Sequence, residues 1–144
     1  MSPTQPKHSA RLAKAAQALV GVPYQRQGRT VAGLDCVGLV LVAAQAVGFD
    51  LSRHDSRSYG QCPSADDLRA RLDASLQEAE GVAVGHIALL ETKGLGDVHL
   101  GIVAERAGVL TLVHSVNSRG CVVEHRLDSQ MRAAIKKTYT LKDE

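Results

Sequence analysis

The spacing of apolar residues changes from helical to strand-like near residue 82, and this change constrains the fold more than any other feature. Before it, apolar residues recur at helical intervals within residues 8–20, 36–47 and 63–78. After it, the intervals are typical of strands near residues 82–91, 98–105, 109–116, 121–125 and 137–141, with a short helix at 128–135. Residues 21–34 and 50–65 are expected to be loops. Helices first and strands later predict an α+β fold, with N-terminal helices packed on a small antiparallel sheet or barrel.

The chain is 144 residues long, which is enough for one domain with its own core. We therefore expect a single domain over residues 1–144, with residues 1–7 as a flexible tail. Aromatic side chains are scarce, with one Phe, three Tyr and no Trp. The core must therefore consist mainly of Val, Leu, Ile and Ala.

Charge and composition exclude several classes of protein. The formal net charge of +2 is too small to indicate a nucleic-acid-binding surface. No apolar run approaches the roughly 20 residues that span a bilayer, and the polar N-terminus lacks the apolar core of a signal peptide. The three cysteines cannot all pair with one another, which is typical of a reducing compartment. We expect synthesis in the cytoplasm without a signal peptide, and neither nucleic acid nor a membrane as a partner.

One cysteine, Cys36, stands where a glycine-containing loop meets a strongly apolar helical run. The preceding residue, Asp35, is a good N-cap. A thiol at a helix start lies near the positive end of the helix dipole, which favours the reactive thiolate, whereas the charge of Asp35 would oppose it. The alternative is a buried core thiol, since cysteine is among the most buried residue types.

Two histidines fall on neighbouring predicted strands, 98–105 and 109–116. A tight turn centred on Arg106–Ala107 would place His99 directly opposite His114, with Cβ atoms about 4.5–5.5 Å apart. One imidazole could then act as a base while the other fixes its tautomer. A turn one residue longer or shorter would put the two on opposite faces of the sheet.

Other partners for these histidines remain open. Asp97 or Asn117 could orient His99 in place of His114. Zinc-type ligands are also present, at Cys36, His99, His114, Cys121 and His125. Structural zinc sites favour short spacings between paired cysteines or paired histidines, and only Cys121 and His125 form even a mixed pair of this kind. We therefore expect no metal and no cofactor.

Four short motifs, taken in order, resemble the NlpC-type cell-wall cysteine peptidases, a papain-like family. They are Gly21-Val22-Pro23-Tyr24, Asp35-Cys36-Val37-Gly38-Leu39, His99-Leu100-Gly101-Ile102 and Val113-His114-Ser115. The resemblance implies a papain-like minimal domain that hydrolyses peptide bonds in the peptide stems of bacterial peptidoglycan. It implies Cys36 as nucleophile, His99 as general base and His114 as its orienting group. Tyr24 and Asp35 would contact the substrate or the oxyanion.

The chain departs from the family pattern in two places. Val37 occupies the position where many members have a serine that holds the substrate's free amine. The usual Pro-Gly-Asp is replaced by Val84-Gly85-His86. A free-standing domain of this kind most resembles versions encoded with phage tails and gene-transfer particles, which implies tail proteins as partners and action on the wall within a particle. The alternatives are a non-catalytic tail-tip component of the same fold, or a thiol acyltransferase or amidase acting on another substrate.

Overall fold

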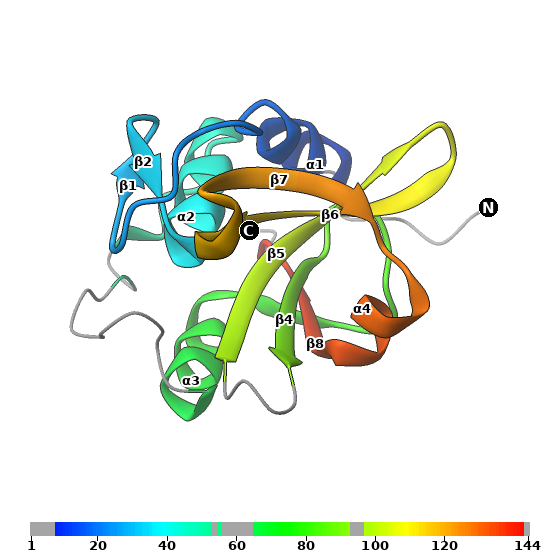
Figure 1. Ribbon diagram of the computed structural model, residues 1–144. Coiled ribbons are helices and arrows are strands. Elements are labelled where there is room, and N and C mark those ends of the chain that lie inside the picture. Colours follow the sequence, from blue (N-terminus) through cyan, green and yellow to red (C-terminus); the bar gives the residue numbers. More distant parts are fainter. Residues whose placement is uncertain (1–7, 53–54, 56–64, 93–96, 143–144) are drawn as a thin grey trace.

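The computed structural model describes residues 8–52, 55, 65–92 and 97–142 (Figure 1). The predicted tail at residues 1–7, Cys62 and the predicted helix start at Pro63–Ser64 lie outside this part of the chain. The helices are α1 (Ser9–Gln17), α2 (Cys36–Ala46), α3 (Ala65–Ser75) and α4 (Ser129–Ala134), with a 3-10 turn, η2, at Asn117–Arg119. The strands are β1 (Arg29–Thr30), β2 (Gly33–Leu34), β3 (Gln77–Ala79), β4 (Ile87–Thr92), β5 (Asp97–Arg106), β6 (Val109–Val116), β7 (Cys121–Arg126) and β8 (Ile135–Thr140).

A six-stranded sheet organises the molecule, with strand order β3-β8-β4-β5-β6-β7 and every neighbouring pair antiparallel. Helices α1 and α2 pack on each other and on β5, and α2 also packs on β6. Figure 1 shows these two helices in the upper half of the view, and α4 at the lower right beside β4 and β8. The predicted α+β fold, with helices on an antiparallel sheet, is therefore confirmed.

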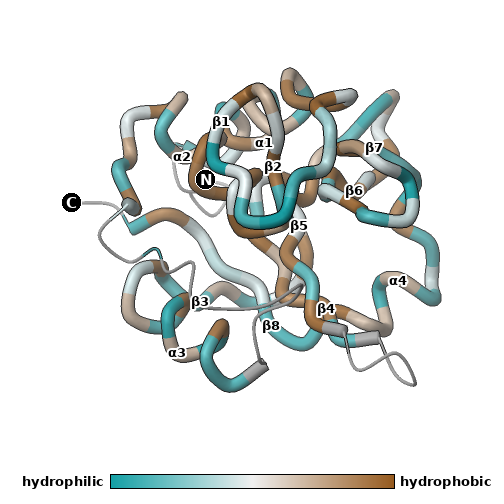
Figure 2. The backbone as a smooth tube through the Cα atoms, turned by 60° about the vertical axis from the view of Figure 1, so that its left-hand side comes forward, coloured by the Kyte–Doolittle hydropathy of each residue, from teal (hydrophilic) through white to brown (hydrophobic). Residues whose placement is uncertain are grey.

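Apolar side chains fill both faces of the sheet. The larger cluster joins α1, α2 and α3 to one face and includes Leu12, Leu39, Leu72 and Ile102. The smaller cluster lies under α4 on the other face, where it includes Leu90, Val103, Leu112 and Leu127. Figure 2 shows hydrophobic segments, in brown, in the centre of the molecule and hydrophilic ones, in teal, over much of the outer loops. An aliphatic core was expected from the scarcity of aromatic residues.

Several element boundaries differ from the prediction. The predicted loop 21–34 contains the short β1–β2 hairpin, and the predicted strand at 82–91 begins only at Ile87. The helix expected to reach residue 78 ends at Ser75, and residues 77–79 form β3 on the edge of the sheet beside β8. Such two- and three-residue strands exist through their pairing partners, so hydrophobic periodicity cannot reveal them.

The β5–β6 hairpin turns one residue later than predicted. Its central residues are Ala107 and Gly108, with φ values of 52° and 78°, and Arg106 pairs with Val109. Turns of this kind need positive φ at both central positions, which favours placing a glycine inside the turn. The prediction that His99 directly faces His114 is therefore wrong.

Candidate active site

Cys36 is the first residue of α2, and Asp35 caps that helix as predicted. The Asp35 backbone is extended, and its Oδ1 accepts a hydrogen bond of 2.8 Å from the Gly38 amide. Cys36 is 9% exposed and carries a thiol rather than a disulfide. Two residues after Cys36, a glycine is required at position 38, because a Cβ there would collide with the backbone carbonyl of Gly28.

Arg29 lies between Asp35 and a second carboxylate, Asp55, and pairs with both. The Arg29 Nη1 lies 2.8 Å from Asp35 Oδ1, and its Nε and Nη2 bind Asp55 at 2.9 and 3.0 Å. The Gln27 amide donates to Asp35 Oδ2 at 3.0 Å. Side chains of Arg29, Asp35 and Asp55 are only 8%, 3% and 14% exposed. A buried guanidinium, shared with Asp55, therefore offsets part of the carboxylate charge that opposes a thiolate at Cys36.

Sequence reasoning missed Arg29. The β1–β2 hairpin pairs Arg29 with Leu34, which brings its side chain beside the residue after Leu34. Arg29 and Asp35 are separated by only five residues, so a pairing between them could have been considered. The pairing follows only once those residues are known to form a hairpin.

Tyr24 is held between two parts of the chain. It forms a bridge with Leu34, two residues before Cys36, and its amide donates to the Gly120 carbonyl at 2.9 Å. Pro23 bridges Cys121, the first residue of β7. Half-buried Tyr24 therefore lies between the residues that precede Cys36 and the start of β7.

Ser115 ties the end of β6 to the same segment. Its hydroxyl donates a buried hydrogen bond of 2.6 Å to the Leu34 carbonyl. The β5–β6 ladder ends at the pair Ile102–Val113, and β6 continues beyond it to Val116. The start of α2 is therefore attached to the open end of this ladder, where β6 carries His114. Ser115 was not among the predicted site residues.

The candidate histidines are neighbours despite the shifted register. His99 pairs with Leu90 of β4, and His114 pairs with Val123 of β7. Burial first, then the charge of His125 and the charge of His99, lower the pKa of His114 from 6.5 to about 4. His114 is therefore neutral at neutral pH, and His99 is near enough to interact with it.

His125 of β7 also contacts His114, with 2.8 Å between the two Nε2 atoms. The sequence suggested His125 only as a zinc-type ligand. Within the described ranges, no three His, Cys, Asp or Glu side chains gather in a group that could hold a metal ion. Of the alternative orienting residues, Asn117 is exposed on η2 and Asp97 begins β5.

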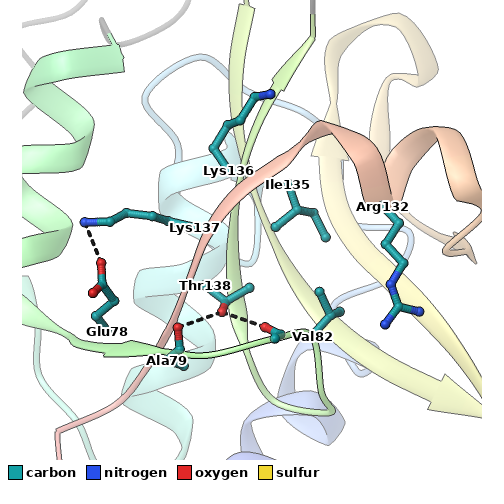
Figure 3. Close-up of a pocket in the computed structure, with 9 residues that line it drawn as sticks. Glu78, Ala79, Val82, Arg132, Ile135, Lys136, Lys137 and Thr138 are labelled. Atoms are coloured by element: carbon teal, nitrogen blue, oxygen red, sulfur yellow. Dashed lines mark hydrogen bonds and ion pairs between the residues drawn. The ribbon is translucent and has the colours of Figure 1, made fainter.

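A surface groove lies away from these residues, between β3, β8 and α4 (Figure 3). It has a volume of about 440 Å³. Lys137, one of the cations that line it, is bound to Glu78 at 2.7 Å and Asp73 at 3.0 Å, and these bonds raise the pKa of Lys137. The Thr138 hydroxyl donates to the Gly81 carbonyl at 2.8 Å. None of the predicted site residues lines this groove.

The described helices include none that combines the length and the apolar character needed to cross a bilayer.

Comparisons with known proteins identify the fold. No protein-family model and no curated protein matches the chain. Among solved structures, it resembles the NlpC/p60 domain of the peptidoglycan hydrolase SagA, at 16% identity and a TM-score of 0.60 over 92% of this chain and 98% of that one. It also resembles an NLP/P60 family lipoprotein-like protein from Staphylococcus aureus subsp. aureus Mu50, at 18% identity and a TM-score of 0.60, covering 100% of this chain and 45% of that one.

A third match is an NlpC/P60 family protein from Bacillus cereus ATCC 10987, at 16% identity and a TM-score of 0.62. The alignment covers 94% of this chain and 40% of that one, so the chain spans less than half of two of these three relatives. The chain therefore has the papain-like α+β fold of the NlpC/p60 domain.

Proposed function

We propose that this protein is a cysteine peptidase that hydrolyses peptide bonds in the peptide stems of bacterial peptidoglycan. The observation that carries the proposal is the position of Cys36, at the capped start of a helix that the Ser115–Leu34 hydrogen bond joins to the open end of the β5–β6 ladder. His99 and His114 interact with each other on the neighbouring strands. The NlpC/p60 fold and a neighbour described as a peptidoglycan hydrolase support the substrate class.

In the proposed reaction, the Cys36 thiol gives its proton to His99 and the thiolate attacks the scissile carbonyl carbon. Negative charge develops on the carbonyl oxygen, and the backbone amide of Cys36 at the helix start can donate to it. The leaving amine takes the proton from His99, which leaves a thioester. Water then attacks the thioester with His99 as base, and this releases the acid and restores the thiol. His114 stays neutral and orients His99.

Recognition of a substrate amine differs from the family pattern in this proposal. Val37 has no side-chain hydrogen-bonding group. Both carboxylate oxygens of Asp35 already bind Gly38, Arg29 and Gln27. Asp35 therefore serves as the helix cap and the charge partner of Arg29. Of the two residues, Tyr24 is the better candidate for a substrate contact.

The test is incubation with defined muropeptides, read by mass spectrometry. Hydrolysis should release fragments with a new amino terminus, Cys36→Ser should release none, and Cys121→Ser should act like the wild type because it keeps the candidate nucleophile. Transfer to an added amine would indicate an acyltransferase, and loss of ammonia alone would indicate an amidase. No fragment from any stem would reject the peptidase proposal.

Thiol reactivity gives a second measurement. We expect iodoacetamide to alkylate Cys36 at pH 6–7 faster than a thiol with the ordinary pKa of about 8.5. The site of alkylation is read by peptide mass spectrometry, with Cys121 as the internal comparison. Equal rates at the two cysteines across this pH range would contradict an activated nucleophile.

We also propose that the protein acts within a phage or phage-like particle, with tail proteins as partners. The support is the resemblance of its loose motif set to particle-encoded members of the family. Particles that carry Cys36→Ala should lose wall cleavage and infect poorly. Equal infectivity and equal cleavage would indicate a structural tail-tip component instead.

A further inference from the structure

His114 is in contact with a second histidine that the proposed mechanism does not use. His125 pairs with Leu112, and His114 pairs with Val123, so the two imidazoles are diagonal neighbours across β6 and β7. Their Nε2 atoms are 2.8 Å apart and their ring planes make an angle of 71°. A hydrogen bond between two ring nitrogens requires that one carries the proton and the other accepts it.

The backbone decides which nitrogen is the donor. His125 Nδ1 lies 2.9 Å from the carbonyl oxygen of Arg126, and a carbonyl oxygen can only accept. Nδ1 of His125 therefore carries a proton. In the neutral ring, Nε2 of His125 is then an acceptor, so the proton between the two rings belongs to Nε2 of His114.

We propose that His125 is a positioning residue that holds His114 in the Nε2–H tautomer, so that His114 offers the lone pair of Nδ1 to His99. Nε2 of His114 is occupied by His125, which leaves Nδ1 as the nitrogen for a second partner. A ring nitrogen of His99 that donates to this Nδ1 leaves the other His99 nitrogen bare. That bare nitrogen accepts the proton when the S–H bond of Cys36 breaks.

A neutral histidine needs a residue that fixes its tautomer more than other orienting residues do. A carboxylate accepts hydrogen bonds on any oxygen, whereas a neutral imidazole turned to the other tautomer presents a donor where an acceptor is required. His114 is 9% exposed, so little water reaches it to substitute for His125. The inference rests on the proposed function for its catalytic meaning, although the tautomer itself does not.

The test is long-range ¹H–¹⁵N NMR of histidine-labelled protein at pH 8, where imidazoles of ordinary pKa are neutral. We expect His114 as the Nε2–H tautomer and His125 as the Nδ1–H tautomer. In His125→Phe the acceptor is gone, and the His114 signals should move toward the other tautomer. In His125→Gln the side-chain oxygen can accept the same bond, so the His114 tautomer should be kept.

Alkylation of Cys36 and muropeptide hydrolysis supply the second readout. His125→Phe should slow both about tenfold or more, since the wrong tautomer of an orienting pair has cost about 10⁴-fold in a well-studied triad. His125→Gln should keep both rates close to those of the wild type, since its amide oxygen can accept the same bond. His86→Gln is the matched control, because His86 also binds a carbonyl through Nδ1, that of Gly81, and has no role in the proposed mechanism.

The outcomes separate this inference from the proposed function. An Nδ1–H tautomer of His114 in the wild type, or an unchanged tautomer and unchanged rates in His125→Phe, would overturn the role of His125 even if muropeptides are cleaved. The expected tautomers with no cleavage of any muropeptide would keep the role of His125 in fixing the tautomer and reject the peptidase. If His125→Phe does not fold, the wild-type tautomer and the His125→Gln rates still decide the question.

Discussion

Replacing Arg29 by methionine tests whether the charge beside Cys36 is balanced as the structure indicates. Arg29 is the cation that Asp35 and Asp55 share, and the two side chains in its shorter pair are 8% and 3% exposed. Removing one partner of a buried ion pair costs about 3–5 kcal/mol, because the remaining charge is left without compensation. Arg29→Met should lose about that much unfolding free energy.

Urea unfolding at pH 7 measures the loss directly. With an m-value of about 1–3 kcal/mol per molar urea for a chain of this size, the midpoint should fall by about 2 M. Arg71→Met is the matched control, because the Arg71–Asp67 pair on α3 is exposed and should be worth at most about 0.5 kcal/mol. Alkylation of Cys36 at pH 7 should also slow in Arg29→Met, since the uncompensated carboxylate of Asp35 opposes a neighbouring thiolate.

A double mutant makes the test specific. Asp35→Asn keeps a good N-cap and removes the charge. Combined with Arg29→Met, it should lose at least about 1 kcal/mol less than the sum of the two single variants. A natively folded Arg29→Met that loses under about 1 kcal/mol, with additive effects in the double mutant, would refute the reasoning.

Three further outcomes are expected. Ser115→Ala should lose about 0.5–1.5 kcal/mol in urea unfolding, since it removes one buried hydrogen bond to the Leu34 carbonyl, which keeps the Gln25 amide as its other donor. Gly38→Ala should lose about 1–3 kcal/mol through collision with the Gly28 carbonyl, although alanine is the better helix former. The pKa of His114 is about 4 in the folded protein, so the unfolded chain binds more protons between pH 4 and 6.5. The free energy of unfolding should therefore fall by up to about 3 kcal/mol as the pH drops through this window. In His114→Gln this fall should be smaller, as measured by urea midpoints at pH 7, 5 and 4.

Ser75→Ala is the control for the first of these, because the Ser75 hydroxyl bonds a carbonyl within its own helix and should matter little. A Gly38→Ala variant more stable than the wild type would contradict the close approach of α2 to Gly28. An identical pH dependence in the wild type and His114→Gln would contradict a neutral, buried His114.

Local signals made α2 predictable. A capping aspartate, an apolar run and a following glycine all lie within Asp35–Gly48, and the structure places the helix at Cys36–Ala46. The class of the fold followed from the order of helices and strands. The end of α3 was misjudged because Leu68, Leu72 and Leu76 keep helical spacing and are all buried, although the helix ends before Leu76.

The β5–β6 register could not be predicted from the sequence, because it depends on the backbone of one residue. Ala107 adopts a positive φ, which non-glycine residues rarely do. In the sequence only Gly108 indicated a turn, and one glycine does not fix which two residues are central. His99 and His114 still share a face of the sheet, because the later turn shifts the pairing of the two strands by two residues. A shift of two residues keeps the alternation of side chains between the faces.

The supporting residues of the site were the least predictable part. Arg29 depends on the β1–β2 hairpin, Ser115 on the contact between β6 and the segment before α2, and His125 on the β6–β7 register. Each contact exists only after two elements have been placed, so no motif or period in the chain points to it.

The segment that carries Tyr24 has a consequence for solubility as well as for chemistry. β7 is an edge strand, and unpaired strand edges recruit other chains. Gly21 and Tyr24 donate amides to the carbonyls of Val122 and Gly120, and Val122 donates to the carbonyl of Val22. This segment therefore shields the first part of the β7 edge from a neighbouring molecule. Substitutions introduced there to alter substrate preference should be examined by light scattering as well as by activity, because a loosened segment would expose an aggregation-prone edge.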